Sequence, residues 1–251
     1  MKGKKFTSIL VAAAMLTAAV PVYEYSGGVS EVVAVAEEAV TIIASGECGA
    51  EGDNVTYTLD SNGVLTISGE GKMSSNKVDM GYTAKRVPWS SYKKDIKKVI
   101  IEEGVTSIGY YSFYDCKSLT EISIPDSVTI IEEYVFSGCS SLIEMRIPDS
   151  VTSIGNRAFE YCDSLTEVTI PDGVTSIGAD TFYGCESLTE IIIPDSVKSI
   201  GEGAFGRCES LTEITLPKNL TSIEDSTFGN CNSLKEVAIP NSVKSIGNKA
   251  F

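Results

Sequence analysis

The chain has 251 residues, of which 43% are apolar, and it carries a net charge of −14 at pH 7. This is enough apolar material for one elongated domain and a small cap. So acidic a surface repels phosphate backbones and anionic lipid, which argues against nucleic acid or a bare membrane as a partner. The chain contains no histidine, which excludes the Ser-His-Asp and Cys-His nucleophile pairs and the commonest metal ligand.

Residues 1–36 are typical of a secretory signal peptide. Three lysines stand among the first five residues, an apolar run follows over residues 8–20, and Ala34-Val35-Ala36 offers a small-residue cleavage site. A cut nearer Ala19 is the alternative. The apolar run is too short to span a bilayer comfortably, and no later apolar stretch reaches about 18 residues. We therefore expect a secreted protein, or one associated with the cell surface, whose mature part remains acidic.

Residues 37–95 are expected to form a small N-terminal β-cap and a loop. Residues 55–59 and 64–67 alternate like strands, and Asp60-Ser61-Asn62-Gly63 between them predicts a hairpin turn. Residues 37–45 look like a lead-in without a clear period, and residues 68–87 look like a loop. We expect Trp89 to cover the exposed end of the first coil that follows.

From residue 96 to residue 251 the sequence repeats every 23 residues. Leucines recur at Leu119, Leu142, Leu165, Leu188, Leu211 and Leu234, and prolines at Pro125, Pro148, Pro171, Pro194, Pro217 and Pro240. Cysteines recur at Cys116, Cys139, Cys162, Cys185, Cys208 and Cys231, and phenylalanines at Phe113, Phe136, Phe159, Phe182, Phe205, Phe228 and Phe251. The repeat predicts a stacked solenoid of six full coils and a truncated seventh, whose first coil has Glu102 in place of the proline.

The repeat that begins at Leu119 shows how one coil forms. Ile122 and Ile124 alternate with Glu121 and Ser123, so one short strand turns its isoleucines toward the core. The proline that follows has no N–H to donate and ends the ladder. Further apolar positions along the repeat return to the core. No single coil can bury these faces alone, so each coil depends on its neighbours.

The phrase Cys-x-x-Leu-x-x-Ile-x-Ile-Pro-x-x-Val-x-x-Ile-Gly-x-x-x-Phe resembles the BspA-like class of bacterial leucine-rich repeats over residues 96–251. Proline and a polar pair stand where the commoner leucine-rich pattern has Asn or Cys, so no asparagine ladder is expected. The segment before the repeats, with Gly46-Glu47-Cys48-Gly49 and Pro88-Trp89, is similar to the region that often precedes them. The resemblance implies a leucine-rich-repeat solenoid with a parallel sheet on its concave face, in a secreted or surface-attached protein.

A column of glutamates is the first candidate partner-binding surface. It comprises Glu121, Glu144, Glu167, Glu190, Glu213 and Glu236, and Asp126, Asp149, Asp172 and Asp195 recur just after the strand. Like charges stacked opposite each other are destabilising, so the column is either a solvated face or a surface for a basic or cation-bridged ligand. Paired carboxylates about 5 Å apart also suit retaining glycoside hydrolysis, but an open stripe lacks the pocket that separates their pKa values.

Tyrosines near the phenylalanine column form the second candidate. Tyr110, Tyr111, Tyr114 and Tyr134 lie in the first coils, and Tyr161 and Tyr183 follow. Tyrosine is favoured at recognition surfaces because it offers a large area at low entropic cost. The alternative is that these rings only shield the convex side.

The cysteines have no zinc-site spacing, since no Cys-x-x-Cys occurs. Equivalent cysteines about 5 Å apart could form disulfides in an exported protein. Identical neighbours in every coil favour buried thiols that act as small packing groups instead. We expect no metal and no cofactor.

These observations predict a non-catalytic, secreted or cell-surface module for protein binding or adhesion. The resemblance implies a protein ligand, such as a host matrix protein or another bacterial surface protein. The charge and the lack of a later apolar stretch predict no nucleic acid partner and no membrane insertion after signal cleavage. The alternatives are a glycan- or cell-wall-binding accessory module of a longer protein, or a structural stalk. Phe251 lies in the phenylalanine column of an unfinished coil, so we expect either a longer protein or a partner at this end.

Overall fold

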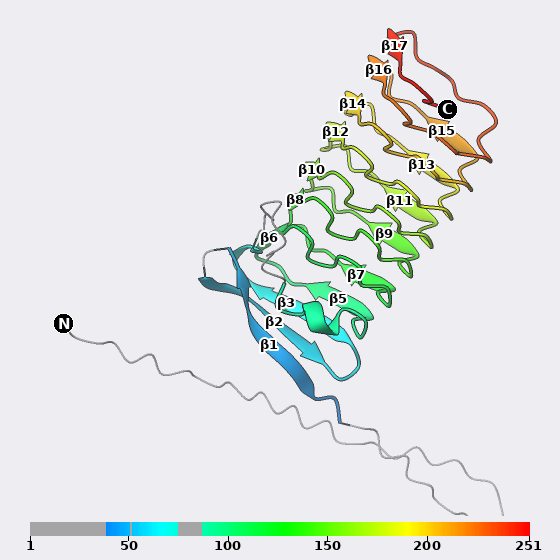
Figure 1. The fold of residues 1–251 in the computed structure, drawn as a ribbon. Coiled ribbons are helices and arrows are strands. Elements are labelled where there is room, and N and C mark those ends of the chain that lie inside the picture. The colour runs from blue at the N-terminus through cyan, green and yellow to red at the C-terminus, as the bar shows by residue number, and fades with distance from the viewer. Residues whose placement is uncertain (1–38, 51, 75–86) are drawn as a thin grey trace, which may run out of the picture. The chain divides into compact units, whose positions relative to one another are not determined.

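Two parallel ladders of short strands run along the repeats (Figure 1). The computed structural model describes residues 39–50, 52–74 and 87–251. The predicted signal peptide lies outside the described residues, as does most of the predicted loop at residues 68–87. Within the part described, the predicted solenoid with a period of 23 residues is confirmed.

The first ladder contains the strands that the glutamate column predicts. Its members are β5 (Lys98–Ile101), β7 (Glu121–Ser123), β9 (Glu144–Arg146), β11 (Glu167–Thr169), β13 (Glu190–Ile192) and β15 (Glu213–Thr215). Pairing is parallel, and Glu167 lies opposite Glu144 as Glu190 lies opposite Glu213. The register therefore equals the sequence period, and identical positions stack directly on one another.

The second ladder follows the proline turn on another side of each coil. It comprises β4 (Gly71–Lys72), β6 (Val105–Ile108), β8 (Ile130–Ile131), β10 (Ser153–Ile154), β12 (Ser176–Ile177), β14 (Ser199–Ile200), β16 (Ser222–Ile223) and β17 (Ser245–Ile246). In most of these strands the isoleucine or valine that faces the core alternates with a more polar neighbour, whereas β8 pairs the buried Ile131 with the half-buried Ile130. The sequence predicted that this segment returns to the core but not that it forms strands.

A turn tract closes each coil between the second ladder and the next strand of the first. Its backbone also bonds between coils: the Phe136 N–H donates to the Ala158 carbonyl at 2.8 Å, and the Gly138 N–H donates to the Glu160 carbonyl at 2.7 Å. In the ladders the later coil donates instead, as Thr129 N–H does to the Thr106 carbonyl at 3.0 Å. Both directions of bonding tie each coil to its neighbours.

Two residues of each turn tract adopt left-handed backbone angles. One column is Tyr111, Tyr134, Arg157, Asp180, Gly203, Ser226 and Lys249, and the other is Asp115, Gly138, Tyr161, Gly184, Arg207 and Asn230, with φ between 51° and 78°. These residues lie two before and two after the phenylalanine, so they turn the chain around its ring. For residues other than glycine this conformation costs roughly 1–2 kcal/mol.

The phenylalanines form one continuous stack through the core. Successive rings from Phe113 to Phe251 have centroids 5.3–5.6 Å apart and interplanar angles of 4–21°. Trp89 begins the stack, 6.1 Å from Phe113, and its indole N–H donates to the Ser112 carbonyl at 2.7 Å. Trp89 is 1% exposed, which confirms that it covers the first coil. It lies beside the short 3₁₀ helix η1 (Ser90–Tyr92).

The N-terminal cap is a three-stranded antiparallel sheet of β1 (Ile42–Gly49), β2 (Gly52–Asp60) and β3 (Val64–Gly69). The predicted hairpin turn is confirmed, because the Asp60 carboxylate accepts the N–H groups of Asn62 and Val64 at 2.9 Å each. β3 then pairs in parallel with β5. The sequence predicted an irregular lead-in at residues 37–45, and this is wrong from Ile42 onward, because pairing with β2 orders β1. The predicted loop at residues 68–87 also contains a strand, β4, which pairs with β6.

Phe159 and Glu167 provide a test of which faces are buried. Phe159 is fully buried and stacks on Phe136 and Phe182 at 5.3 Å, whereas Glu167 is exposed. Phe159→Ala should lower the free energy of unfolding by about 3–5 kcal/mol. Glu167→Ala should change it by less than about 0.5 kcal/mol, or stabilise slightly by relieving repulsion. Urea denaturation of the two variants measures the difference, and similar losses would contradict the assigned faces.

Candidate binding surfaces

The glutamate column forms an exposed stripe on the first ladder. All six glutamates, Glu121, Glu144, Glu167, Glu190, Glu213 and Glu236, are exposed. Lys98 precedes the column and pairs with Glu121 at 2.5 Å. Among the described residues, none of the other five glutamates has an ion pair. The stripe is therefore mostly negative charge without an ion-pair partner, with the exposed Arg146 on the same face of β9, and we call it the glutamate stripe.

Two apolar side chains protrude from the same ladder. Ile192, at the end of β13, is 71% exposed and lies between Thr169 and Thr215 of the neighbouring strands. Ile143, just before β9, is 50% exposed and occupies a position that is threonine in the next three coils. The glutamate stripe is thus flanked by isolated apolar side chains that the sequence analysis did not single out, although each stands where neighbouring coils have threonine.

The aspartates after the strand are less uniform. Asp195 accepts hydrogen bonds from the Lys218 ammonium at 2.8 Å and the Lys218 N–H at 3.1 Å, and these bonds lower the pKa of its carboxyl. The other three, Asp126, Asp149 and Asp172, are exposed. The exposed ion pair between Asp195 and Lys218 contributes little to stability. Together the four aspartates extend the acidic surface beyond the strands.

The tyrosines lie in the turn tracts, away from the glutamate stripe. Tyr111 stacks on Tyr134 with centroids 4.6 Å apart and meets Tyr114 edge-on at 5.5 Å. Tyr110 is half-buried beside them. Tyr161 and Tyr183 make a second edge-on pair at 5.6 Å. The predicted partner-binding residues therefore form two separate surfaces, one of glutamates and one of tyrosines.

Arginine and lysine bridge the tyrosines to nearby acids. The Arg157 guanidinium lies 5.5 Å from the Tyr134 ring centroid, donates to the Tyr134 hydroxyl at 2.7 Å and pairs with Asp180 at 3.0 Å. Burial opposes its charge, but the bonds to Asp180 and Tyr134 outweigh burial and raise the pKa of Arg157. Lys93 lies 5.8 Å from the Tyr114 ring and pairs with Asp115 at 2.6 Å. These contacts hold the rings in place.

A groove of about 280 Å³ lies between Tyr114 and Tyr161, which we call the tyrosine groove. Its walls include Tyr114, Asp115, Ser137, Gly138, Glu160 and Tyr161. The two rings are 45% and 42% exposed, and they belong to coils that are two repeats apart, with one coil between them. The coil between them carries only Ser137 and Gly138 at the matching positions. The sequence analysis named Tyr114 and Tyr161 but missed the groove and its carboxylates.

The carboxyl groups of the tyrosine groove differ in the direction in which their surroundings shift their pKa values. Burial raises the pKa of Glu160, although Ser137 donates a hydrogen bond to it at 3.1 Å and Arg157 lies 3.8 Å away. Burial also raises the pKa of Asp163, with Glu186 adding to the effect. For Asp115 the effect of burial is outweighed by Lys93 and Lys117, which lower its pKa. The groove therefore offers several fixed acceptors and one lysine donor.

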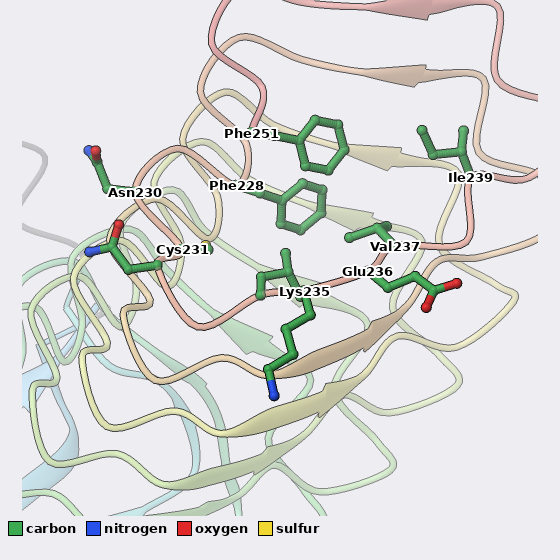
Figure 2. Close-up of a pocket in the computed structure, with 10 residues that line it drawn as sticks. Phe228, Asn230, Cys231, Lys235, Glu236, Val237, Ile239 and Phe251 are labelled. Carbon is green, nitrogen blue, oxygen red and sulfur yellow. The ribbon is translucent and has the colours of Figure 1, made fainter.

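A second pocket, of about 550 Å³, opens at the last coil (Figure 2). Figure 2 shows the rings of Phe228 and Phe251 together with Val237 and Ile239 at its apolar side and Lys235 and Glu236 at its rim. Its apolar walls belong to the same columns that the next coil covers elsewhere in the solenoid. The pocket is therefore an exposed part of the apolar core, and its polar residues lie at the rim.

The seven cysteines are buried free thiols. From Cys139 onward each Sγ lies against the carbonyl of a phenylalanine in the preceding coil, as Cys139 does with Phe113 at 3.1 Å and Cys162 with Phe136 at 3.3 Å. In the described residues, no group of three or more cysteines or acids is placed to hold a metal ion. No helix there is long and apolar enough to cross a membrane.

Parallel strands repeated every 23 residues around shared apolar columns define the class of leucine-rich-repeat solenoids. The chain belongs to the family described as "BspA type Leucine rich repeat region", whose model matches residues 90–179 and 152–251 in six copies, more than half of the chain. Repeats of this family are generally binding modules and not enzymes. No curated protein matches the chain.

Several solved bacterial structures resemble the chain. The leucine-rich-repeat protein of T. pallidum is 29% identical, with 80% of this chain and 86% of that chain covered and a TM-score of 0.59. A leucine-rich cell surface protein of Faecalibacterium prausnitzii is 23% identical, covering 79% and 84%, with a TM-score of 0.36. A leucine-rich-repeat protein of Eubacterium ventriosum is 20% identical, covering 83% and 94%, with a TM-score of 0.31. Only the first likeness is close enough to support the fold.

Thiol labelling tests the role of the cysteines. Burial raises the pKa of Cys48 and Cys116 to about 12 and that of Cys231 to about 11, and the thiolate is the reactive form. Iodoacetamide at pH 8 should therefore label the native protein only slowly. After denaturation without reductant it should label all seven cysteines, as a reduced control does. Labelling of almost none in the unreduced sample would show that they are oxidised.

Proposed function

We propose that the protein is a secreted or cell-surface module that binds another protein through the glutamate stripe. The observation that carries the proposal is the repeated, exposed and mostly uncompensated glutamate at one strand position of successive coils. Stacked like charges oppose folding, so a stripe of this kind is costly unless it meets a partner of opposite charge. Its ligand is then a protein with a basic surface, either a host matrix protein or a surface protein of another bacterium.

Two further features favour a protein ligand. The ladder is broad and open, and repeat solenoids use such surfaces to bind extended areas of a partner. Ile192 and Ile143 add exposed apolar contacts beside the charges, and protein interfaces combine a few apolar anchors with a polar rim. The predicted signal peptide at residues 1–36 is consistent with surface exposure.

Charge substitution with salt titration tests the stripe. The double change Glu167→Gln and Glu190→Gln should weaken binding to immobilised basic matrix proteins in surface plasmon resonance. Glu202 and Glu209 are also exposed but lie off the first ladder, so Glu202→Gln with Glu209→Gln is a control with the same change of net charge. Binding of the unaltered protein should weaken at least about tenfold between about 0.05 M and 0.5 M NaCl, because salt screens exposed charges. Equal effects of the two double variants would overturn the proposal.

Ile192→Thr tests the apolar contribution separately. Threonine occupies the equivalent position in both neighbouring strands, so stability should change by less than about 0.5 kcal/mol. If Ile192 anchors the partner, the free energy of binding should weaken by about 1–2 kcal/mol, and the dependence of binding on salt should remain. Unchanged affinity would show that Ile192 does not contact the partner. A thermal unfolding curve of the variant confirms that the fold is intact.

A further inference from the structure

The tyrosine groove has features that the glutamate stripe does not explain. It lies in the turn tracts and not on the first ladder, and it is concave where the stripe is open. Its volume of about 280 Å³ is near the lower end of the range of roughly 300–1,000 Å³ that is typical of small-molecule sites. It is therefore of a size for one small ring and not for a protein surface.

The groove arises from a particular order of side chains in three successive coils. Tyr114 and Tyr161 supply large rings from the outer two coils, and Ser137 and Gly138 leave a notch in the coil between them. Gly138 has φ of 78°, and a Cβ added there would meet Asp115 only at ordinary contact distances of 3.4–3.6 Å. A larger residue could therefore fit at position 138 without a clash. The notch is open because serine and glycine are small.

Both rings are held in place by neighbouring tyrosines, and at Tyr161 the backbone would favour a smaller residue. Tyr161 has φ of 55° in a column where Gly138, Gly184 and Asn230 share the left-handed conformation. A bulky side chain is costly there. Tyr161 packs on Tyr183 at 5.6 Å, and Tyr114 packs on Tyr111 at 5.5 Å. Both rings are therefore fixed by neighbours while more than two fifths of each remains exposed.

The polar groups of the groove match hydroxyl chemistry. Glu160 and Asp115 are oriented by Ser137 and Lys93 and accept hydrogen bonds, while Lys117 and the Ser140 hydroxyl can donate. A pyranose ring has a face of C–H groups that can lie on an aromatic ring, and a rim of hydroxyls that both donate and accept. Three carboxylates, with Asp163 as the third, and one lysine line the groove, while Lys93 and Arg157 pair with Asp115 and Glu160. The groups that a ligand would meet are therefore mostly hydrogen-bond acceptors, which favours a ligand with hydroxyls over an acidic one.

We propose that the tyrosine groove is a saccharide-binding site that takes a non-acidic sugar ring between Tyr114 and Tyr161. The site is separate from the proposed protein-binding face and does not depend on it. Each ring stacks against a C–H face, and Asp115 and Glu160 accept hydrogen bonds from the hydroxyls. The ligand is a neutral or amino-bearing glycan of a cell wall or a host surface.

Saturation-transfer NMR and calorimetry with the whole protein test this site. The probes are neutral oligosaccharides of glucose, galactose, mannose and N-acetylglucosamine, with uronic acid and sialic acid glycans as the acidic set. At least one neutral probe should bind, with affinity nearly unchanged by salt. Binding of no neutral probe, or of acidic probes alone, would overturn the proposal.

The repeats supply variants that keep the fold. Tyr161→Gly reproduces the residue of two neighbouring coils, and Gly138→Asn fills the notch with the residue that Asn230 places at the same left-handed position. Each should weaken sugar binding roughly tenfold, the scale of one lost aromatic contact. Asn230→Gly is the control, since it changes the same left-handed column three coils from Tyr161 to the glycine found in Gly184, and Asn230 does not line the groove. Sugar binding that survives both groove variants would also refute the assignment.

The two proposals can fail independently. Glu167→Gln with Glu190→Gln should leave sugar binding unchanged, and Tyr161→Gly should leave binding to a basic protein unchanged. Loss of sugar binding in the glutamate variant would mean that the ligand lies on the glutamate stripe, and the groove assignment would then be wrong.

Discussion

Hydrogen bonding between coils is the constraint on which the rest of the structure depends. Within a coil the backbone groups of the strands and the turn tract find their partners in the coils before and after it, as Thr129 does with Thr106 and Phe136 with Ala158. A buried backbone group without a partner is costly. Each coil must therefore keep the same length and the same turns as its neighbours. A constant period, here 23 residues, follows from this requirement, and so does the direct stacking of identical positions.

Direct stacking has opposite consequences inside and outside the coil. Inside, it places phenylalanine rings 5.3–5.6 Å apart, where flat rings fill the space without voids. Outside, it places equal charges opposite one another, as with Glu144 and Glu167, and this opposes folding. The interior columns are explained by stability alone. The glutamate column and the tyrosines at left-handed positions are not, and for that reason they carry the functional argument.

The sequence predicted the features that depend on one column at a time. Which residues are buried, where the first ladder runs and which glutamates are exposed all follow from periodicity within a repeat. Features that depend on pairs of segments were harder to predict. β1 is ordered by β2, and the short strands of the second ladder are ordered by bonding between coils more than by their own composition.

The tyrosine groove was also missed because it depends on residues of several coils. It depends on a comparison across three coils: large residues at Tyr114 and Tyr161, and small ones at Ser137 and Gly138 between them. A reading along each repeat records the tyrosines, but not the gap between them. Aligning the repeats and comparing side-chain volume at the turn positions would have found it, because in a solenoid the neighbour in space is the residue 23 positions away.

The spacing of the glutamate stripe also limits what can bind along it. Successive glutamates are one coil apart, about 4.8 Å, whereas side chains on one face of an extended peptide are separated by about 6.6–6.8 Å. A basic peptide lying along the solenoid would lose register with the glutamates after two or three coils. A folded surface avoids this mismatch, because it can present lysines and arginines from several segments, whose spacing is not fixed by one extended strand. The geometry of the stripe therefore favours a folded basic protein over a linear basic motif.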